Sequence, residues 1–173
     1  LSCTNGEEYK FEPEVYFRYN LSENSVFNRD RFTAVIEENS LKLCLNSVLR
    51  LLSQRMHSVY EIKQKLKKKG FSYRTIDKVI VESENMNLLN DEQFARNYTE
   101  ELIHKGLGKY KIINSLQKRG ISKEMIEEYL KVLDAPGAEE KRAEEALKRK
   151  IKSLAYKEIE PQKLKEKLIR HLI

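Results

Sequence analysis

The sequence predicts an all-α chain built from tandem three-helix repeats, preceded by a short N-terminal extension of mixed structure. The first observation behind this prediction is an internal repeat, because residues 60–80 and 110–130 match at a constant offset of 50 positions. The identical pairs are Tyr60/Tyr110, Ile62/Ile112, Leu66/Leu116, Lys68/Lys118, Gly70/Gly120, Ser72/Ser122 and Ile76/Ile126. Self-similarity at a fixed period indicates that one supersecondary unit recurs along the chain. The second observation is apolar spacing of three and four residues, which is typical of amphipathic helices.

Residues 1–39 are predicted to form the N-terminal extension. Tyr9-Lys10-Phe11-Glu12 alternates in polarity like a short strand, which Pro13 would end because proline lacks a backbone N–H. Short amphipathic stretches follow around residues 15–21 and 31–36.

Residues 40–86 are predicted to form the first repeat. A helix is expected from Leu41, and its apolar residues recur at helical spacing at Leu45, Val48, Leu49 and Leu52. Ser58 and Glu61 form a capping-box pattern that starts the second helix, and Gly70 is placed to end it. Ser72 then starts the third helix, whose predicted buried residues are Ile76, Val79 and Ile80.

Residues 87–134 are predicted to form the second repeat, and residues 135–173 an incomplete third. In the second repeat, Asn90 or Asp91 caps a helix with one apolar face, formed by Phe94, Ala95, Tyr98 and Leu102. Residues 134–137 read as a turn. Leu147, Ile151 and Leu154 indicate the next helix, and Leu164, Leu168 and Leu172 the last one. Because residue 1 is Leu and the pattern stops before the expected glycine turn, we expect a fragment or a trimmed chain.

Charge is distributed unevenly along the sequence. Residues 1–39 hold four Lys/Arg and eight Asp/Glu, whereas the whole chain carries a net charge of +6. A basic body favours contact with a polyanion, although a solvated lysine-rich surface explains the charge equally well. The two cysteines, Cys3 and Cys44, do not indicate a disulfide scaffold, and Cys44 is expected in a core. We therefore expect a reducing, cytoplasmic location, and no apolar run approaches membrane length.

No catalytic, metal-binding or cofactor-binding pattern is found in the sequence. His57, His104 and His171 lie far apart, and no HExxH or CxxC motif occurs. The candidate site is instead a set of basic residues that recurs at the ends of the predicted helices. The residues predicted to contact a partner or nucleic acid are Lys63, Lys67, Lys68, Lys69, Lys109, Lys111, Lys118 and Arg119. Cations stabilise a helix C-terminus, but that effect accounts for only one or two of them per helix.

Several segments of the two predicted repeats resemble the RecX family. They are residues 51–61 and 69–71 in the first repeat, and residues 89–95, 105–108 and 118–121 with Tyr98 in the second. The extension resembles that of long Gram-positive RecX forms. The resemblance implies three tandem three-helix repeats in an elongated curved array. It also implies a non-enzymatic, cytoplasmic regulator that binds the groove of the RecA filament on single-stranded DNA. Such a protein damps ATP hydrolysis, strand exchange and co-protease function, and so regulates recombination, DNA repair and the SOS response.

The predicted function is therefore modulation, mainly inhibition, of RecA by a monomer that uses no cofactor and contacts no membrane. Two alternatives stay open. The first is a stand-alone DNA-binding protein in which each trihelical unit works like a helix-turn-helix. Acidic residues on the third helices, such as Asp77, Glu127 and Glu128, argue against insertion of those helices into a DNA groove. The second alternative is an α-helical adaptor that binds a protein without DNA.

Overall fold

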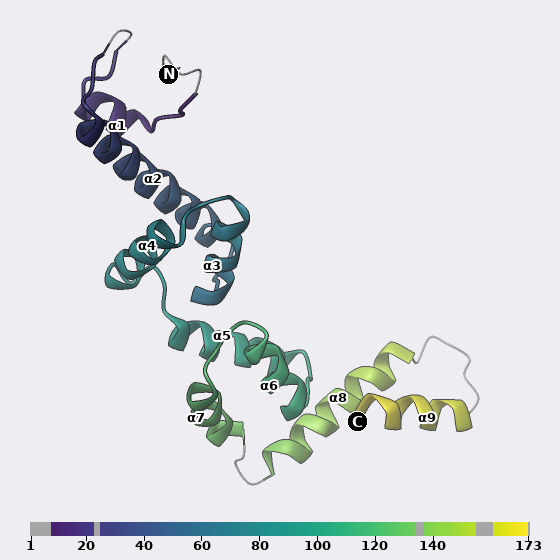
Figure 1. Ribbon diagram of the computed structural model, residues 1–173. Coiled ribbons are helices and arrows are strands. Elements are labelled where there is room, and N and C mark those ends of the chain that lie inside the picture. The colour runs from purple at the N-terminus through teal and green to yellow at the C-terminus, as the bar shows by residue number, and fades with distance from the viewer. Residues whose placement is uncertain (1–7, 23–24, 134–136, 155–160, 173) are drawn as a thin grey trace. The chain divides into compact units, whose positions relative to one another are not determined.

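Helices dominate the computed structural model, which describes residues 8–22, 25–133, 137–154 and 161–172. The helices are α1 (Pro13–Arg18), α2 (Arg29–Leu52), α3 (Val59–Lys68), α4 (Tyr73–Asn85), α5 (Asp91–His104), α6 (Lys109–Gln117), α7 (Lys123–Leu133), α8 (Ala138–Leu154) and α9 (Pro161–Leu172) (Figure 1). Within the described ranges no strand is formed. The chain divides into two compact units, Leu1–Leu89 and Asn90–Ile173. The all-α prediction is therefore confirmed.

The first three-helix repeat consists of the C-terminal part of α2 with α3 and α4, which all contact one another. Its core holds Cys44, Val48, Ile62, Leu66, Ile76, Val79 and Ile80, together with Leu89. Burial of these side chains is the main source of stability, at about 25 cal/mol for each Å² of apolar surface removed from water. The predicted burial of Ile76, Val79 and Ile80 is confirmed, whereas Leu49, on the apolar side of α2, is 43% exposed.

The second repeat packs α5, α6 and α7 against each other around a separate core. The residues at its centre are Phe94, Ala95, Leu102, Ile112, Leu116, Ile121 and Ile126. Ile62, Leu66 and Ile76 in the first repeat and Ile112, Leu116 and Ile126 in the second are all buried, as the offset of 50 positions predicts. Tandem three-helix repeats are thus confirmed by the packing as well as by the sequence.

The helix boundaries of the repeats follow the predicted local signals. Ser58 accepts a hydrogen bond from the Glu61 amide, and the Glu61 carboxylate accepts one from the Ser58 amide, which completes the capping box. Asn90, rather than Asp91, caps α5. Gly70 and Gly120 have φ of 88° and 76°. At each glycine the next residue donates its N–H to a carbonyl five residues back, so both glycines occupy the left-handed position of a Schellman motif.

The N-terminal extension differs from its prediction. Residues 9–12 form no strand, because their backbone is bound by one side chain of α2 instead of by a partner strand. The buried Asn39 amide donates to the Lys10 carbonyl at 2.7 Å and accepts from the Glu12 N–H at 2.9 Å. Pro13 begins α1 rather than ending a strand, since its missing N–H is not needed in a first helical turn.

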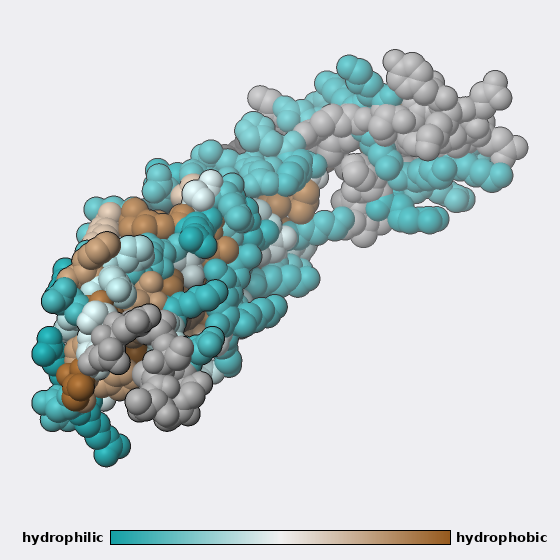
Figure 2. Space-filling view, turned by 90° about the horizontal axis from the view of Figure 1, so that it is seen from above, coloured by the Kyte–Doolittle hydropathy of each residue, from teal (hydrophilic) through white to brown (hydrophobic). Residues whose placement is uncertain are grey.

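The helix expected from Leu41 begins twelve residues earlier, at Arg29 of α2, where Asn28 caps it by accepting from the Arg31 N–H. The predicted boundary after residue 39 therefore lies inside a continuous helix. The extension has its own small core of Val15, Leu21 and Val35, with Phe11, Tyr16, Tyr19 and Phe27 packed around it. Figure 2, which is seen from the α1 end of Figure 1, shows apolar residues gathered at this end of the first unit. Phe17 of α1 is 77% exposed.

The C-terminal segment contains α8 and α9, which contact each other. The predicted helix through Leu147 and Ile151 is formed as α8; Leu147 is half-buried, whereas Ile151 is 45% exposed. The side chains of Leu154, Leu164, Leu168 and Leu172 lie outside the described residues, as do residues 134–136 of the predicted turn.

Candidate functional site

Two titratable side chains, Cys44 and His57, are buried and therefore inaccessible to a partner. Burial raises the pKa of the Cys44 thiol from 9.0 to about 11, against a smaller opposing effect of the Lys69 charge. Burial lowers the pKa of His57, whose Nδ1–H donates to the Arg55 carbonyl at 2.9 Å. Over the described ranges, no three His, Cys, Asp or Glu side chains gather as metal ligands. In those same ranges, no helix has the length and apolarity that a membrane span requires.

The basic residues of the first repeat lie along α3 and at its C-terminal end. The Lys63 Nζ is 2.8 Å from an Asp77 carboxylate oxygen, which joins α3 to α4. The Lys67 Nζ lies 5.0 Å from the centre of the Tyr73 ring, an exposed cation–π contact worth about 0.5–1 kcal/mol. Lys68 and Lys69 are exposed at the helix end. Two of the four predicted residues therefore have local structural roles, and Lys68 and Lys69 project into solvent.

The basic residues of the second repeat lie at both ends of α6. Lys109 and Lys111 belong to its first turn, which contains no acidic residue and is capped by Gly108 without a side-chain hydrogen bond. A helix N-terminus carries partial positive charge, so lysines at this end are unfavourable for the helix itself. Helix stability therefore does not explain Lys109 and Lys111. At the other end, Lys118 is the exposed C-cap residue of α6.

Arg119 follows Lys118 and is half-buried rather than fully exposed. Its guanidinium carbon lies 4.2 Å from the centre of the Tyr98 ring and 6.0 Å from that of Phe94. These two rings stack on each other with centres 5.6 Å apart. The Arg119 side chain therefore covers an aromatic pair of the second core instead of projecting fully into solvent.

The predicted basic residues of the two repeats occupy equivalent positions only at the C-terminal ends of α3 and α6. At the offset of 50 positions, Lys68 corresponds to Lys118 and Lys69 to Arg119. Lys63 and Lys67 correspond to the uncharged residues Ile113 and Gln117. The recurrent element is therefore a basic pair directly before the Schellman glycine, and the other lysines are specific to one repeat. On α9, the exposed basic residues are Lys163, Lys165, Lys167 and Arg170.

The aromatic residues beside these cations were not predicted as part of the site. Tyr73, Tyr98 and Phe94 lie under basic side chains, and each is separated from its cation by a turn or a helix in sequence. Only the spacing between Lys67 and Tyr73 is short enough to have suggested a contact. Tyr110, which is 83% exposed between Lys109 and Lys111, was visible in the sequence as an aromatic residue flanked by cations.

Comparison with known proteins identifies both repeats. Residues 44–82 match the family model described as the first three-helix domain of RecX, and residues 90–130 match that of the second. The regulatory protein RecX of Prosthecochloris aestuarii is 31% identical over 139 residues, which cover 80% of this chain and 87% of that protein. RecX of Clostridium perfringens (strain 13) is 28% identical over 162 residues, or 94% of this chain and 76% of the relative.

Solved structures share the fold. A crystal structure of regulatory protein RecX aligns with a TM-score of 0.70 and 17% identity, covering 95% of this chain and 82% of that one. RecX from Lactobacillus salivarius aligns with a TM-score of 0.61 and 20% identity, over 78% of this chain and 86% of that one. The matched family domains coincide with the two repeats built around Leu66 and Leu116. This chain belongs to the RecX family of regulatory proteins.

Proposed function

We propose that this chain regulates the RecA recombinase, mainly as an inhibitor, by binding the RecA filament on single-stranded DNA through basic residues at the ends of α3 and α6. Membership of the RecX family of regulatory proteins supports the regulatory part of this proposal. The surface chemistry supports the partner, since exposed cations favour an acidic protein groove or a row of phosphates. Binding would be non-covalent and would need no cofactor.

The observation that carries the proposal is the recurrence of Lys68 and Lys118 at equivalent helix ends. Both side chains are exposed, and each belongs to a separate folded core. A favourable interaction with the helix dipole accounts for a cation at such an end. It does not account for Lys111 at the opposite end of α6, where the dipole disfavours a cation. A polyanionic or acidic partner accounts for all three residues.

The test is ATP hydrolysis by the cognate RecA on single-stranded DNA, measured with increasing amounts of this protein. The double variant Lys68→Glu/Lys118→Glu should keep its helical circular dichroism, because both side chains are exposed. It should require a higher concentration to suppress hydrolysis, since two cations that face the filament become anions. Suppression by the native protein should also weaken with salt, by about 0.7 in the slope of log affinity against log salt for each single-strand phosphate contact.

The matched control is Arg50→Glu/Lys78→Glu, which makes the same change in net charge at exposed positions on α2 and α4. This control should suppress hydrolysis like the native protein. If Lys68→Glu/Lys118→Glu is equally active, the ends of α3 and α6 are not the working surface. If the native protein leaves RecA unaffected but binds duplex DNA, the chain acts instead as a stand-alone DNA-binding protein.

A further inference from the structure

The exposed face of α6 has a composition unlike the rest of the second repeat. We define this face by its five exposed residues, which are Tyr110, Lys111, Asn114, Gln117 and Lys118. It contains an aromatic ring, two cations and two side-chain amides, and no acidic residue occurs anywhere in α6. Tyr110 is 83% exposed, so its ring gains almost nothing from burial in the protein's own core.

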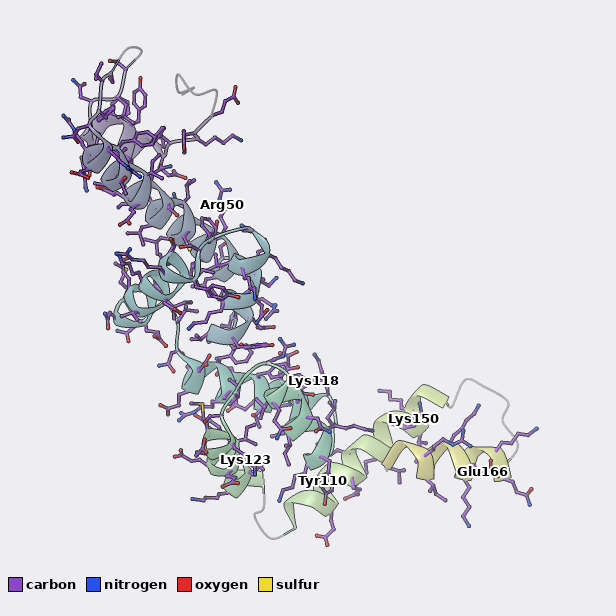
Figure 3. All side chains as sticks on the ribbon, in the orientation of Figure 1. Arg50, Tyr110, Lys118, Lys123, Lys150 and Glu166 are labelled. Atoms are coloured by element: carbon purple, nitrogen blue, oxygen red, sulfur yellow. The ribbon has the colours of Figure 1, made fainter. Side chains whose placement is uncertain are left out.

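Helix geometry places these groups in a consistent order. Lys111 and Lys118 are seven residues apart, which is almost two full turns, so they lie on one side of α6 and about 10 Å apart along its axis. Asn114 lies between them on that side, and Tyr110 is adjacent to Lys111. Figure 3 labels Tyr110 and Lys118 at the two ends of the helix. The face thus offers an aromatic surface at one end and a cation near each end.

The corresponding face of α3 lacks this character. Tyr60 occupies the position equivalent to Tyr110, but Glu61 replaces Lys111. The Glu61 carboxylate completes the capping box of α3 and lies 3.0 Å from the Arg55 guanidinium. The neighbour of Tyr60 is therefore an anion that is already paired with Arg55, whereas the neighbour of Tyr110 is a cation. The two repeats share a fold and an aromatic position, but only the second has a wholly non-acidic face.

We propose that the exposed face of α6 is a direct contact for single-stranded nucleic acid, in which Tyr110 stacks on a base and Lys111 and Lys118 contact phosphates. Single-strand binding surfaces combine cations that follow the backbone with aromatic rings on which bases stack. The side-chain amides of Asn114 and Gln117 add donors and acceptors for base edges or sugars. Lysines alone would also suit an acidic protein, but the exposed ring beside them favours a strand of bases, each of which offers a flat face for stacking.

This contact deepens the proposed function and rests on it for the identity of the polyanion, which would be the single strand on which the RecA filament forms. It is measurable without RecA, by fluorescence anisotropy of a labelled oligo(dT) and of an abasic oligonucleotide of equal length. The abasic strand keeps the phosphates and removes the bases, so it separates stacking from charge attraction.

Tyr110→Ala should weaken binding to oligo(dT) by roughly 5- to 150-fold, the range for loss of one base–aromatic stack. Its binding to the abasic strand should stay within about twofold of the native value, because the phosphate contacts remain. Tyr110→Phe keeps the ring and should bind oligo(dT) like the native protein. Lys111→Gln should weaken binding to both strands and lower the salt slope by about 0.7.

Tyr60→Ala is the matched control and should bind both strands like the native protein. Equal losses for the two strands in Tyr110→Ala would overturn the stacking assignment, and so would unchanged binding to oligo(dT) or failure of the native protein to bind it. Preferential binding to an acidic protein through Tyr110 would overturn the nucleic-acid assignment. If Tyr110-dependent binding is found but RecA hydrolysis is unaffected, the proposed function fails while this contact stands.

Discussion

Leu116→Ala should destabilise the second repeat while leaving the first repeat intact. Leu116 is completely buried, and Phe94 of α5, Ile112 of α6 and Ile126 of α7 belong to the same core. Truncation of a buried leucine removes its transfer free energy and leaves a cavity, which together cost about 2–5 kcal/mol. Because all three helices of the repeat contact one another, the cavity cannot close easily, and a value in the upper part of that range is expected.

The assay is amide hydrogen exchange followed by mass spectrometry, since the chain has no Trp to report unfolding by fluorescence. Peptides from α5, α6 and α7 should exchange faster by up to roughly 4,000-fold, which is the upper end of the cost above expressed as an opening equilibrium. Peptides from α3 and α4 should keep their native rates, because their core forms a separate cluster. Leu66→Ala, the matched variant, should give the reverse pattern.

Equal acceleration in both repeats would refute the reasoning, because it would mean that the two cores unfold as one cooperative unit. Unchanged exchange in Leu116→Ala would refute the assignment of Leu116 to the centre of its core. Either result would also weaken the argument that Lys68 and Lys118 are displayed by two separately folded repeats.

Two further predictions follow from the buried titratable groups. In a Cys3→Ser background, Cys44 should react with a thiol reagent only after unfolding. The pKa of the Cys44 thiol is raised from 9.0 to about 11, so the unfolded state loses the thiol proton at a lower pH than the native state. The free energy of unfolding should therefore fall as pH rises from about 9 toward 11. The variant Cys44→Ala should lose this contribution to the pH dependence. His57 has a lowered pKa, so the native state should lose stability as pH falls below 6.5, where the unfolded state binds the proton more readily. In His57→Gln, the free energy of unfolding should fall less steeply between pH 6.5 and 5 than in the native protein. If the two proteins lose stability with the same slope, other groups cause the acid sensitivity.

The helices of the repeats were predictable because their signals are local. Ser58 and Ser72 cap helices through hydrogen bonds to amides three residues away, and Gly70 and Gly120 end helices within the same turn. The buried positions Leu66 and Leu116 follow from apolar periodicity, which depends only on helix geometry. For the candidate site, the exposure of Lys68 and Lys118 could be predicted in the same way.

Contacts between distant residues could not be predicted from these patterns. The alternation in residues 9–12 is compatible with a strand, but Asn39 lies 27 to 29 positions away and binds that backbone instead. Likewise, the residues next to Arg119 in the sequence give no sign of its contact with an aromatic ring. Only the tertiary structure places it over Tyr98, 21 positions earlier. The contacts of a polar group depend on which residues the fold brings within hydrogen-bond or van der Waals distance.

By itself, then, the sequence determined the repeat, its helix caps and glycine turns, its buried apolar positions and the family to which the chain belongs. Each of these depends on interactions within one or two turns of helix or on similarity between strings of residues. Only the tertiary structure decided that α2 extends back to Arg29, that Ile151 is exposed and that Lys63, Lys67 and Arg119 have partners inside their own repeats. The physical reason is that burial and pairing are properties of packed helices, and the local sequence fixes the helices but not their neighbours.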